Sequence, residues 1–143
     1  MDAFDSDVLI YAAVGDHPLG RRVLALFADR GDDEPVGIGS VLLIPELLTK
    51  PTRRQATAEI EALAALLGRL DLCPVDAVIA ELAVALGASY ALRAPDALHL
   101  ATAVAAGADR FITNNIKDFP STISEIDITT PADLADPSEA GAT

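Results

Sequence analysis

The sequence predicts an α/β fold, a three-layer sandwich in which helices cover both faces of a central parallel sheet of about five short strands. The first observation is size, because 143 residues, 51% of them hydrophobic, suit one domain with its own core. The second is alternation: short apolar, β-branched stretches are separated by longer stretches with apolar residues at helical spacing. Strands that alternate with helices form parallel sheets, since each connection crosses back over the sheet.

The expected strands are short, and the first carries two aspartates. They cover residues 3–11 (AFDSDVLIY), 35–40 (PVGIGS), 110–113 (RFIT) and 125–129 (EIDIT), the last at an edge of the sheet. Residues 71–75 (DLCPV) are expected to form a brief extended link. The carboxyl ends of parallel strands form the ligand crevice of such sheets, so Asp5 and the residues just after Thr113 are expected there.

Helices are expected where apolar residues recur every three or four positions. They cover residues 17–33, 41–50, 52–70, 76–93 and 94–108. Gly31 and Gly107 end two of them, and Pro95 suits the first turn of another. Ser40 is a good N-cap for the helix in residues 41–50, but Pro45 leaves open whether that helix kinks or begins at Pro45 itself.

Composition and charge exclude several classes of protein. Cys73 is the single cysteine, which excludes a disulfide framework or a cysteine zinc site within one chain and predicts a reducing, cytoplasmic setting. The acidic start MDAFDSD is unlike a signal peptide, and charges interrupt the apolar segments, so neither secretion nor a membrane partner is expected. The net charge of −12 disfavours non-specific adhesion to nucleic acid. The predicted domain covers residues 1–130, and residues 131–143 are expected to be a flexible acidic tail.

Oxygen ligands stand beside apolar segments at four places. They are Asp5 with Asp7, Glu46 after LLIP, Asp96 after RAP, and Asn115 with Asp118 in FITNNIKDF. Each aspartate alone has an ordinary role in a turn or a first helical turn, but Glu46 lies in an apolar segment, where a carboxylate is costly unless a cation or donors meet it. A divalent cation relieves the repulsion among converging carboxylates, and oxygen ligands favour Mg²⁺ or Mn²⁺. Such an ion typically meets a phosphate, so phosphodiester hydrolysis is the expected chemistry.

Four segments match the motifs of a known family in order and spacing. They are FDSDVLIYA, SVLLIPELLTKP, PDALHLATAVAAGA and RFITNNIKDF. From Asp5 to about Ile128 the chain resembles a PIN domain, and within that group a VapC-type toxin ribonuclease of a type II toxin–antitoxin system. The resemblance implies a Mg²⁺-dependent endoribonuclease that cuts RNA, forms a homodimer and is inhibited by a cognate antitoxin. It also implies that Asp5, Glu46 and Asp96 are the catalytic, metal-binding residues.

The chain departs from the family's pattern at two positions. Asp7 stands where the family commonly has Asn or Ser, and Asn115 replaces the fourth acid of many members, with Asp118 three residues later. A hydroxyl, amide or carboxylate beside a metal ligand can fix the direction of that ligand. The residues expected in this supporting role are Ser6, Asp7, Thr113, Asn115 and Asp118.

Half of the basic residues lie within a few positions of the proposed ligands. They are Lys50, Arg53, Arg54, Arg93 and Lys117. In a chain this acidic, the clustering suggests a rim that receives RNA phosphates, although solvated ends of helices and loops are the usual place for such charges. His99 follows Asp96 by one helical turn and is within reach of the same crevice, but packing with a bond to the backbone is the commoner role, which we expect here.

Two alternative functions stay open at this point. DSDVL mimics the DxDx[TV] motif of haloacid dehalogenase-type phosphatases, with Asp5 as nucleophile and Asp7 as acid, but the later lysine and acidic pair of that family do not follow. The other alternative is a catalytically weak or inactive PIN-like module that binds RNA or a protein, which Asn115 motivates. The apolar content of so small a domain leaves helix faces for a partner, so a homodimer is expected on this ground too.

Overall fold

The computed structural model describes residues 1–28, 31 and 33–140. Within them one parallel sheet has the strand order β3-β2-β1-β4-β5. The strands are β1 Asp2–Phe4, β2 Gly37–Ser40, β3 Leu70–Cys73, β4 Arg110–Ile112 and β5 Asp127–Thr129. The helices are α1 Ser6–Ala13, α2 Pro18–Ala28, α3 Leu43–Arg53, α4 Thr57–Leu67, α5 Ala77–Tyr90, α6 Ala94–Ala105 and α7 Pro137–Ala140, with a 3₁₀ turn η1 at Pro131–Asp133. The predicted α/β fold with a parallel sheet of about five strands is confirmed.

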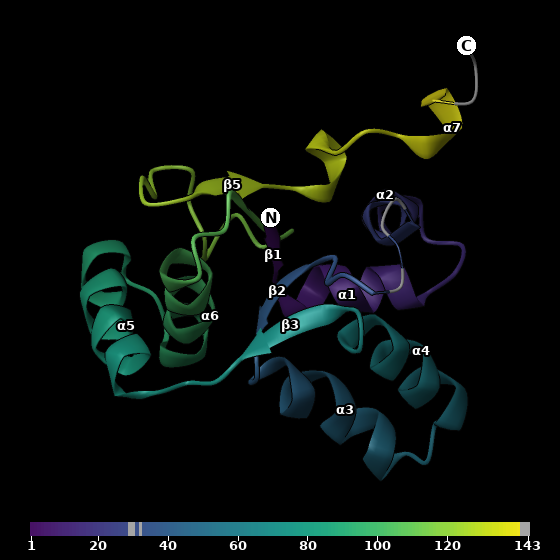
Figure 1. Cartoon of the computed structure of the whole chain (residues 1–143), viewed down its shortest axis with the longest axis horizontal. Coiled ribbons are helices and arrows are strands. Elements are labelled where there is room, and N and C mark those ends of the chain that lie inside the picture. The colour runs from purple at the N-terminus through teal and green to yellow at the C-terminus, as the bar shows by residue number, and fades with distance from the viewer. Residues whose placement is uncertain (29–30, 32, 141–143) are drawn as a thin grey trace.

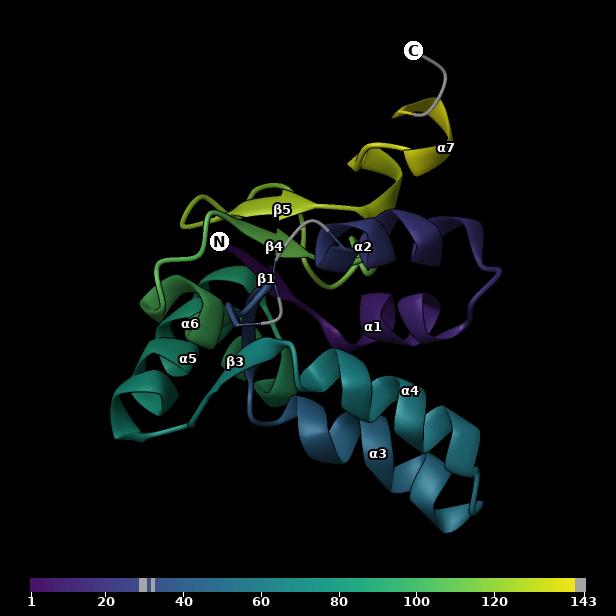
Figure 2. The same ribbon diagram turned by 45° about the vertical axis from the view of Figure 1, so that its right-hand side comes forward.

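Helices lie on both faces of the sheet (Figure 1). On one face α1 to α4 pack around a core that includes Phe4, Val8 and Leu43. On the other face α5 and α6 pack around a second core that includes Leu100 and Phe111. Figure 2 shows α3 and α4 side by side, and they are in contact along their length. Each helical layer is therefore anchored by its own apolar cluster on the shared sheet.

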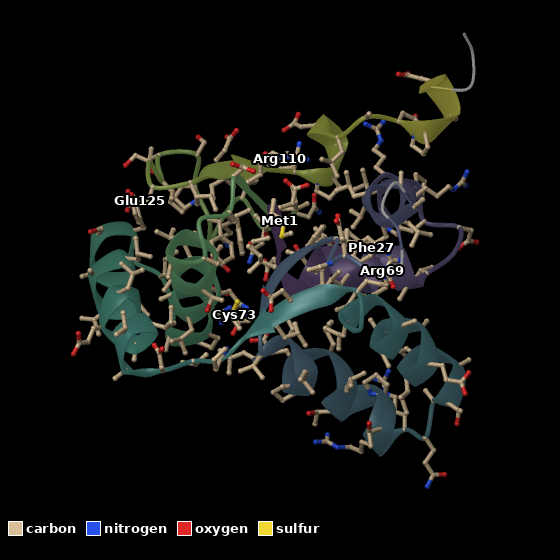
Figure 3. All side chains as sticks on the ribbon, in the orientation of Figure 1. Met1, Phe27, Arg69, Cys73, Arg110 and Glu125 are labelled. Carbon is tan, nitrogen blue, oxygen red and sulfur yellow. The ribbon has the colours of Figure 1, made fainter. Side chains whose placement is uncertain are left out.

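The central strand β1 pairs with both β2 and β4. Asp2, its first residue, lies opposite Arg110 and accepts two hydrogen bonds from that guanidinium, each 2.9 Å long. Figure 3 labels Arg110, which begins β4, and Cys73, which ends β3; the two mark the amino and carboxyl edges of the sheet. The helices α1, α3 and α5 each begin shortly after a strand, so their N-termini lie at the carboxyl edge.

Two predicted elements differ from the structure. The strand expected over residues 3–11 ends at Phe4, because Asp5 caps a helix that places Val8, Leu9 and Ala12 on one buried face. The link expected over residues 71–75 is wrong as well, since Leu70–Cys73 form an edge strand that pairs with all of β2. A short apolar run fits a strand or a helix equally well by pattern, and only its tertiary neighbours decide.

The third helix answers the question that Pro45 left open. Helix α3 begins at Leu43, so Pro45 falls in its first turn, where no backbone donor is needed. Ser40 still acts locally, because its hydroxyl oxygen accepts the backbone N–H of Leu42. The end of the helix predicted over residues 17–33 falls partly on residues 29, 30 and 32, which lie outside the described residues.

The segment after β5 contacts the second helix. The Arg22 guanidinium on α2 donates to the backbone oxygens of Ala132 and Leu134, and Leu134 is buried in the core beside α1 to α4. The division at residue 130 and the flexible tail stay predictions, and residues 141–143 lie outside the described part.

Among the described residues no single helix is long and apolar enough to cross a membrane; α5 and α6 reach that length and composition only together, across a bend of 114°.

Candidate active site

Asp5 lies at the carboxyl end of the central strand β1, beside the end of β4. It follows β1 and serves as the N-cap of α1, where its Oδ1 accepts the Ser6 N–H at 2.8 Å. Its Oδ2 accepts the Thr113 hydroxyl at 2.7 Å, and Thr113 follows the neighbouring strand β4. The backbone N–H of Asp5 donates to Ile112 O at 3.0 Å, which fixes the register between the two strand ends. Pairing of β1 with β4 thus brings a carboxylate and a hydroxyl together across 108 residues.

Asp5 is held in a place where its negative charge is costly. Its side chain is 5% exposed, and burial raises its pKa, although the Thr113 hydroxyl and the Ser6 amide oppose the shift. The nearby Asp96 carboxylate raises the pKa of Asp5 further. A buried carboxylate with two donors and another acid nearby is stabilised in its charged form by a cation.

Asp7 is a second acid whose charge is only partly compensated. Its Oδ2 accepts the Asn114 N–H at 3.0 Å, whereas its Oδ1 is buried and has no hydrogen-bond partner among the described residues. Burial, followed by the charge of Asp5, raises the pKa of Asp7 to about 6. Asp7 therefore carries its charge near neutral pH at a cost in stability.

Glu46 and His99 form a pair that joins the two helical layers. Glu46 is in the first turn of α3, and its Oε2 lies 2.9 Å from Nε2 of His99, which α6 carries. The hydrogen bond from His99 lowers the pKa of Glu46 more than partial burial raises it, and the Ser6 side chain lowers it further. Burial lowers the pKa of His99, but the Glu46 hydrogen bond and the charges of Glu46, Asp5 and Asp96 outweigh it, so the pKa is raised. Of the four acids that line the pocket, Glu46 is therefore the one whose pKa is lowered.

Asp96 is oriented by a charge rather than by a hydrogen bond. It lies in the first turn of α6, 3.7 Å from the Arg93 guanidinium, and its Oδ2 is buried without a hydrogen-bond partner among the described residues. Burial raises the pKa of Asp96 against the opposing effect of Arg93, and the charges of Asp118 and Glu46 raise it further. Its buried oxygen therefore has unused capacity to accept a cation or a donor.

Asn115 and Asp118 form a turn beside the other acids. The Asn115 amide donates to Asp118 Oδ2 at 2.8 Å, and the Asn115 N–H donates to the Thr113 hydroxyl oxygen at 3.0 Å. Arg93 approaches Asp118 Oδ2 to 3.8 Å. The turn thus places a neutral amide, rather than a further acid, next to the carboxylate cluster.

One pocket of about 360 Å³ brings most of these residues together. It is lined by Asp5, Ser6, Asp7, Glu46, Arg93, Pro95, Asp96 and Asn115. Thr113 and Asp118 do not line the pocket, but they are hydrogen-bonded to Asp5 and Asn115, which do. Of the five basic residues predicted to form a rim, Arg93 lines the pocket, and Lys50, Arg53 and Arg54 lie on the last turn and C-cap of α3. Lys117 is exposed in the loop after β4.

The chemistry of the pocket fits Mg²⁺ or Mn²⁺ better than zinc. Among the described residues, the buried oxygens of the pocket that lack a hydrogen bond belong to the carboxylates of Asp7 and Asp96, and a hard cation prefers such ligands. In the part of the chain that the structure describes, no three His, Cys, Asp or Glu side chains are grouped closely enough to hold a metal ion by themselves.

His99 is the site residue that sequence reasoning misses. The expected role was packing with a backbone bond, yet the ring bonds the Glu46 carboxylate. Spacing alone gave a signal, because His99 follows Asp96 by three positions and shares its helix face. The partner could not be inferred, since Glu46 is 53 residues away on another helix.

The fold and the pocket define an α/β domain with a carboxylate-lined site at the carboxyl edge of its sheet. The model of the PIN domain family matches residues 3–122, so the chain belongs to the PIN domain family, which confirms the resemblance and leaves the haloacid dehalogenase alternative without support. No curated protein sequence matches the chain.

Similar solved structures come from bacterial complexes. A toxin–antitoxin complex from Klebsiella pneumoniae aligns with a TM-score of 0.71 and 27% identity, over 92% of this chain and 98% of the other. VapBC2 from Rickettsia felis, bound to a DNA fragment from their promoter, aligns with a TM-score of 0.69 and 21% identity, over 90% and 97%. VapBC-1 from nontypeable Haemophilus influenzae aligns with a TM-score of 0.69 and 16% identity, over 92% of this chain and 98% of the other. The last two are similar in fold alone.

Proposed function

We propose that this PIN domain is a metal-dependent endoribonuclease and the toxin of a toxin–antitoxin pair. The observation that carries the proposal is the single pocket in which Asp5, Glu46 and Asp96 meet from three separate segments of the chain. Two of the pocket's acids keep buried oxygens without a hydrogen bond among the described residues, which is costly unless a cation is bound. Membership of the PIN family and similarity to toxin–antitoxin complexes support the same function.

Asp5, Asp96 and Glu46 are the proposed ligands of Mg²⁺, with Mn²⁺ as a substitute. When bound, the ion supplies a nucleophilic water near neutral pH and neutralises the charge on the leaving oxygen of the phosphodiester. The protein's part is to hold the acids in place. Thr113 and the Ser6 amide hydrogen-bond Asp5, the His99 ring lies within hydrogen-bond distance of Glu46, and Arg93 attracts Asp96.

Arg93 is also suited to receive the RNA backbone. It lines the pocket, its side chain is 78% exposed, and its ion pairs at 3.7 and 3.8 Å are long enough to yield to a phosphate. Lys117 in the loop after β4, and Lys50, Arg53 and Arg54 at the opposite end of α3 from Glu46, do not line the pocket, and we propose that they receive phosphates farther along the RNA. Contacts of this kind position RNA without reading its sequence.

We further propose a cognate antitoxin protein, a homodimer and a cytoplasmic location. The solved structures of similar fold include complexes of toxins with antitoxins, and 27% identity over nearly the whole chain accompanies one of them. An antitoxin that supplies an arginine or lysine to the pocket would satisfy the acids that a cation otherwise neutralises. This explains how one partner can block both the metal and the RNA.

The decisive test is RNA cleavage by the wild type and by Asp5→Asn and Asp96→Asn variants, with Mg²⁺ and with EDTA. We expect the cleavage rate of each variant and of the EDTA sample to fall by at least about a hundredfold. Even mutation of a residue that only hydrogen-bonds a metal ligand typically lowers activity by about ten- to a hundredfold. Asp127→Asn is the matched control, because Asp127 is exposed on β5 and does not line the pocket. Undiminished cleavage by either pocket variant would refute the mechanism.

The second candidate is a PIN-like module that binds RNA or a protein without catalysis. Two observations favour it: Asn115 replaces an acid, and no three-ligand group is present among the described residues. Thermal unfolding with added Mg²⁺ or Mn²⁺ separates the two, because only a working site gives stabilisation that Asp5→Asn abolishes.

A further inference from the structure

His99 is a buried polar ring that the proposed catalytic chemistry does not itself require. It is 3% exposed on α6, and its one side-chain hydrogen bond among the described residues is the 2.9 Å contact with Glu46 Oε2. Glu46 belongs to α3, in the opposite helical layer, so this contact crosses the carboxyl edge of the sheet. A buried imidazole is costly unless it is paired, and here all of its pairing is directed at one carboxylate.

The geometry assigns the donor in this contact. A charged carboxylate only accepts, so Nε2 of His99 carries the hydrogen that Glu46 receives. Nδ1 is buried and has no hydrogen-bond partner among the described residues. No backbone bond at Nδ1 orients the ring, which leaves packing and the Glu46 contact to do so.

Glu46 depends on such support more than Asp5 does. Asp5 is fixed by two short bonds on a buried side chain, whereas Glu46 has a longer side chain that is one-third exposed. A long side chain loses more rotamer entropy when a ligand immobilises it, and a partner that holds it in advance reduces that loss. We propose that His99 is a positioning residue that holds the Glu46 carboxylate toward the pocket and thereby strengthens binding of the divalent cation, an inference that rests on the proposed function.

Substitution of His99 by asparagine or by glutamine tests this proposal, because the two side chains carry the same amide group but differ in length. The side-chain nitrogen of glutamine can reach the position of Nε2, whereas that of asparagine ends near Nδ1 and falls short of Glu46. We expect His99→Asn to weaken Mg²⁺ binding to the full-length chain by about tenfold or more, measured by calorimetry, and His99→Gln to restore most of the affinity. Thr102→Val, a buried change on the same helix that does not touch the pocket, should leave Mg²⁺ affinity unchanged.

A double-mutant cycle with Glu46→Ala separates positioning from packing. If His99 acts through Glu46, then His99→Asn should cost nothing further in Mg²⁺ affinity once Glu46 is removed. Three results would each overturn the inference. His99→Asn could reduce Mg²⁺ affinity equally in the Glu46→Ala background, it could leave the affinity of the otherwise wild-type chain unchanged, or His99→Gln could fail to restore binding. If the wild type binds no Mg²⁺, or Glu46→Ala binds it as tightly as the wild type, the proposed ligand set itself fails. Circular dichroism of each variant shows that it is folded.

Discussion

Replacing Asp7 with asparagine should stabilise the metal-free protein at neutral pH. The pKa of Asp7 rises from 3.8 to about 6, first through burial and then through the charge of Asp5. The folded state therefore favours the protonated acid. The charge of Asp7 does not destabilise the folded state below the unfolded pKa, but its cost grows between about pH 4 and 6 and is complete above that range. A difference of about two pKa units corresponds to about 3 kcal/mol, which solvent screening of this partly exposed group reduces to about 1–2 kcal/mol.

The assay is thermal unfolding in EDTA at about pH 7.5 and pH 5. Asparagine keeps an oxygen to accept the Asn114 N–H and removes the like charge beside Asp5. We expect Asp7→Asn to raise the melting temperature by roughly 3–8 °C at the higher pH and by about half as much at the lower pH. Asp127→Asn, on the exposed edge strand, serves as the control for the removal of one negative charge away from the pocket. The reasoning is refuted if the gain is the same at both pH values, or if the variant is less stable at pH 7.5.

Two further substitutions test the support around the acids. Thr113→Val removes the hydroxyl that donates to buried Asp5, so cleavage should fall by about ten- to a hundredfold and the free energy of unfolding by about 1–3 kcal/mol. Thr102→Val is the control and should keep full cleavage, because the Thr102 hydroxyl donates to the Leu98 backbone and not to an acid of the pocket. Asn115→Asp replaces a donor to Asp118 with a like charge, so stability in EDTA should fall by about 1–3 kcal/mol, and excess Mg²⁺ should restore part of it in a thermal melt. A Thr113→Val enzyme with normal cleavage, or an Asn115→Asp chain as stable as the wild type in EDTA, would contradict these expectations.

The sequence was sufficient to locate the acids but not to fix all the elements that carry them. Asp96 stands beside a strong local signal, a proline in the first helical turn, which the structure confirms, whereas Asp5 follows a strand that ends seven residues earlier than predicted. The sequence nevertheless predicts a strand over residues 6–11, because a short apolar run does not reveal its period. The Asp5 carboxylate accepts a hydrogen bond from the Ser6 N–H, which caps α1 where the strand ends, and one from the hydroxyl of Thr113, a residue more than a hundred positions away.

The partners of the acids were the least predictable part of the site. Local pattern places Glu46 on one helix and His99 on another, but their contact depends on how the two layers are set against the same sheet. The Asp7 bond to the Asn114 N–H has the same origin, since it joins α1 to the loop after β4. Such contacts come from the pairing of β1 with β4 and from core packing, which no single stretch of sequence contains.

The distribution of hydrogen bonds within the pocket shows where a cation would relieve the most cost. Asp5 has both oxygens bonded, and Glu46 has a short bond to His99. Asp96 and Asp7 each keep one buried oxygen without a hydrogen bond among the described residues, and the pKa of each is raised. Charged acids in this state repel one another, so the metal-free pocket is destabilised just where the proposed chemistry requires a cation. Binding energy from the ion offsets that repulsion, which links the stability of the fold to occupation of the site.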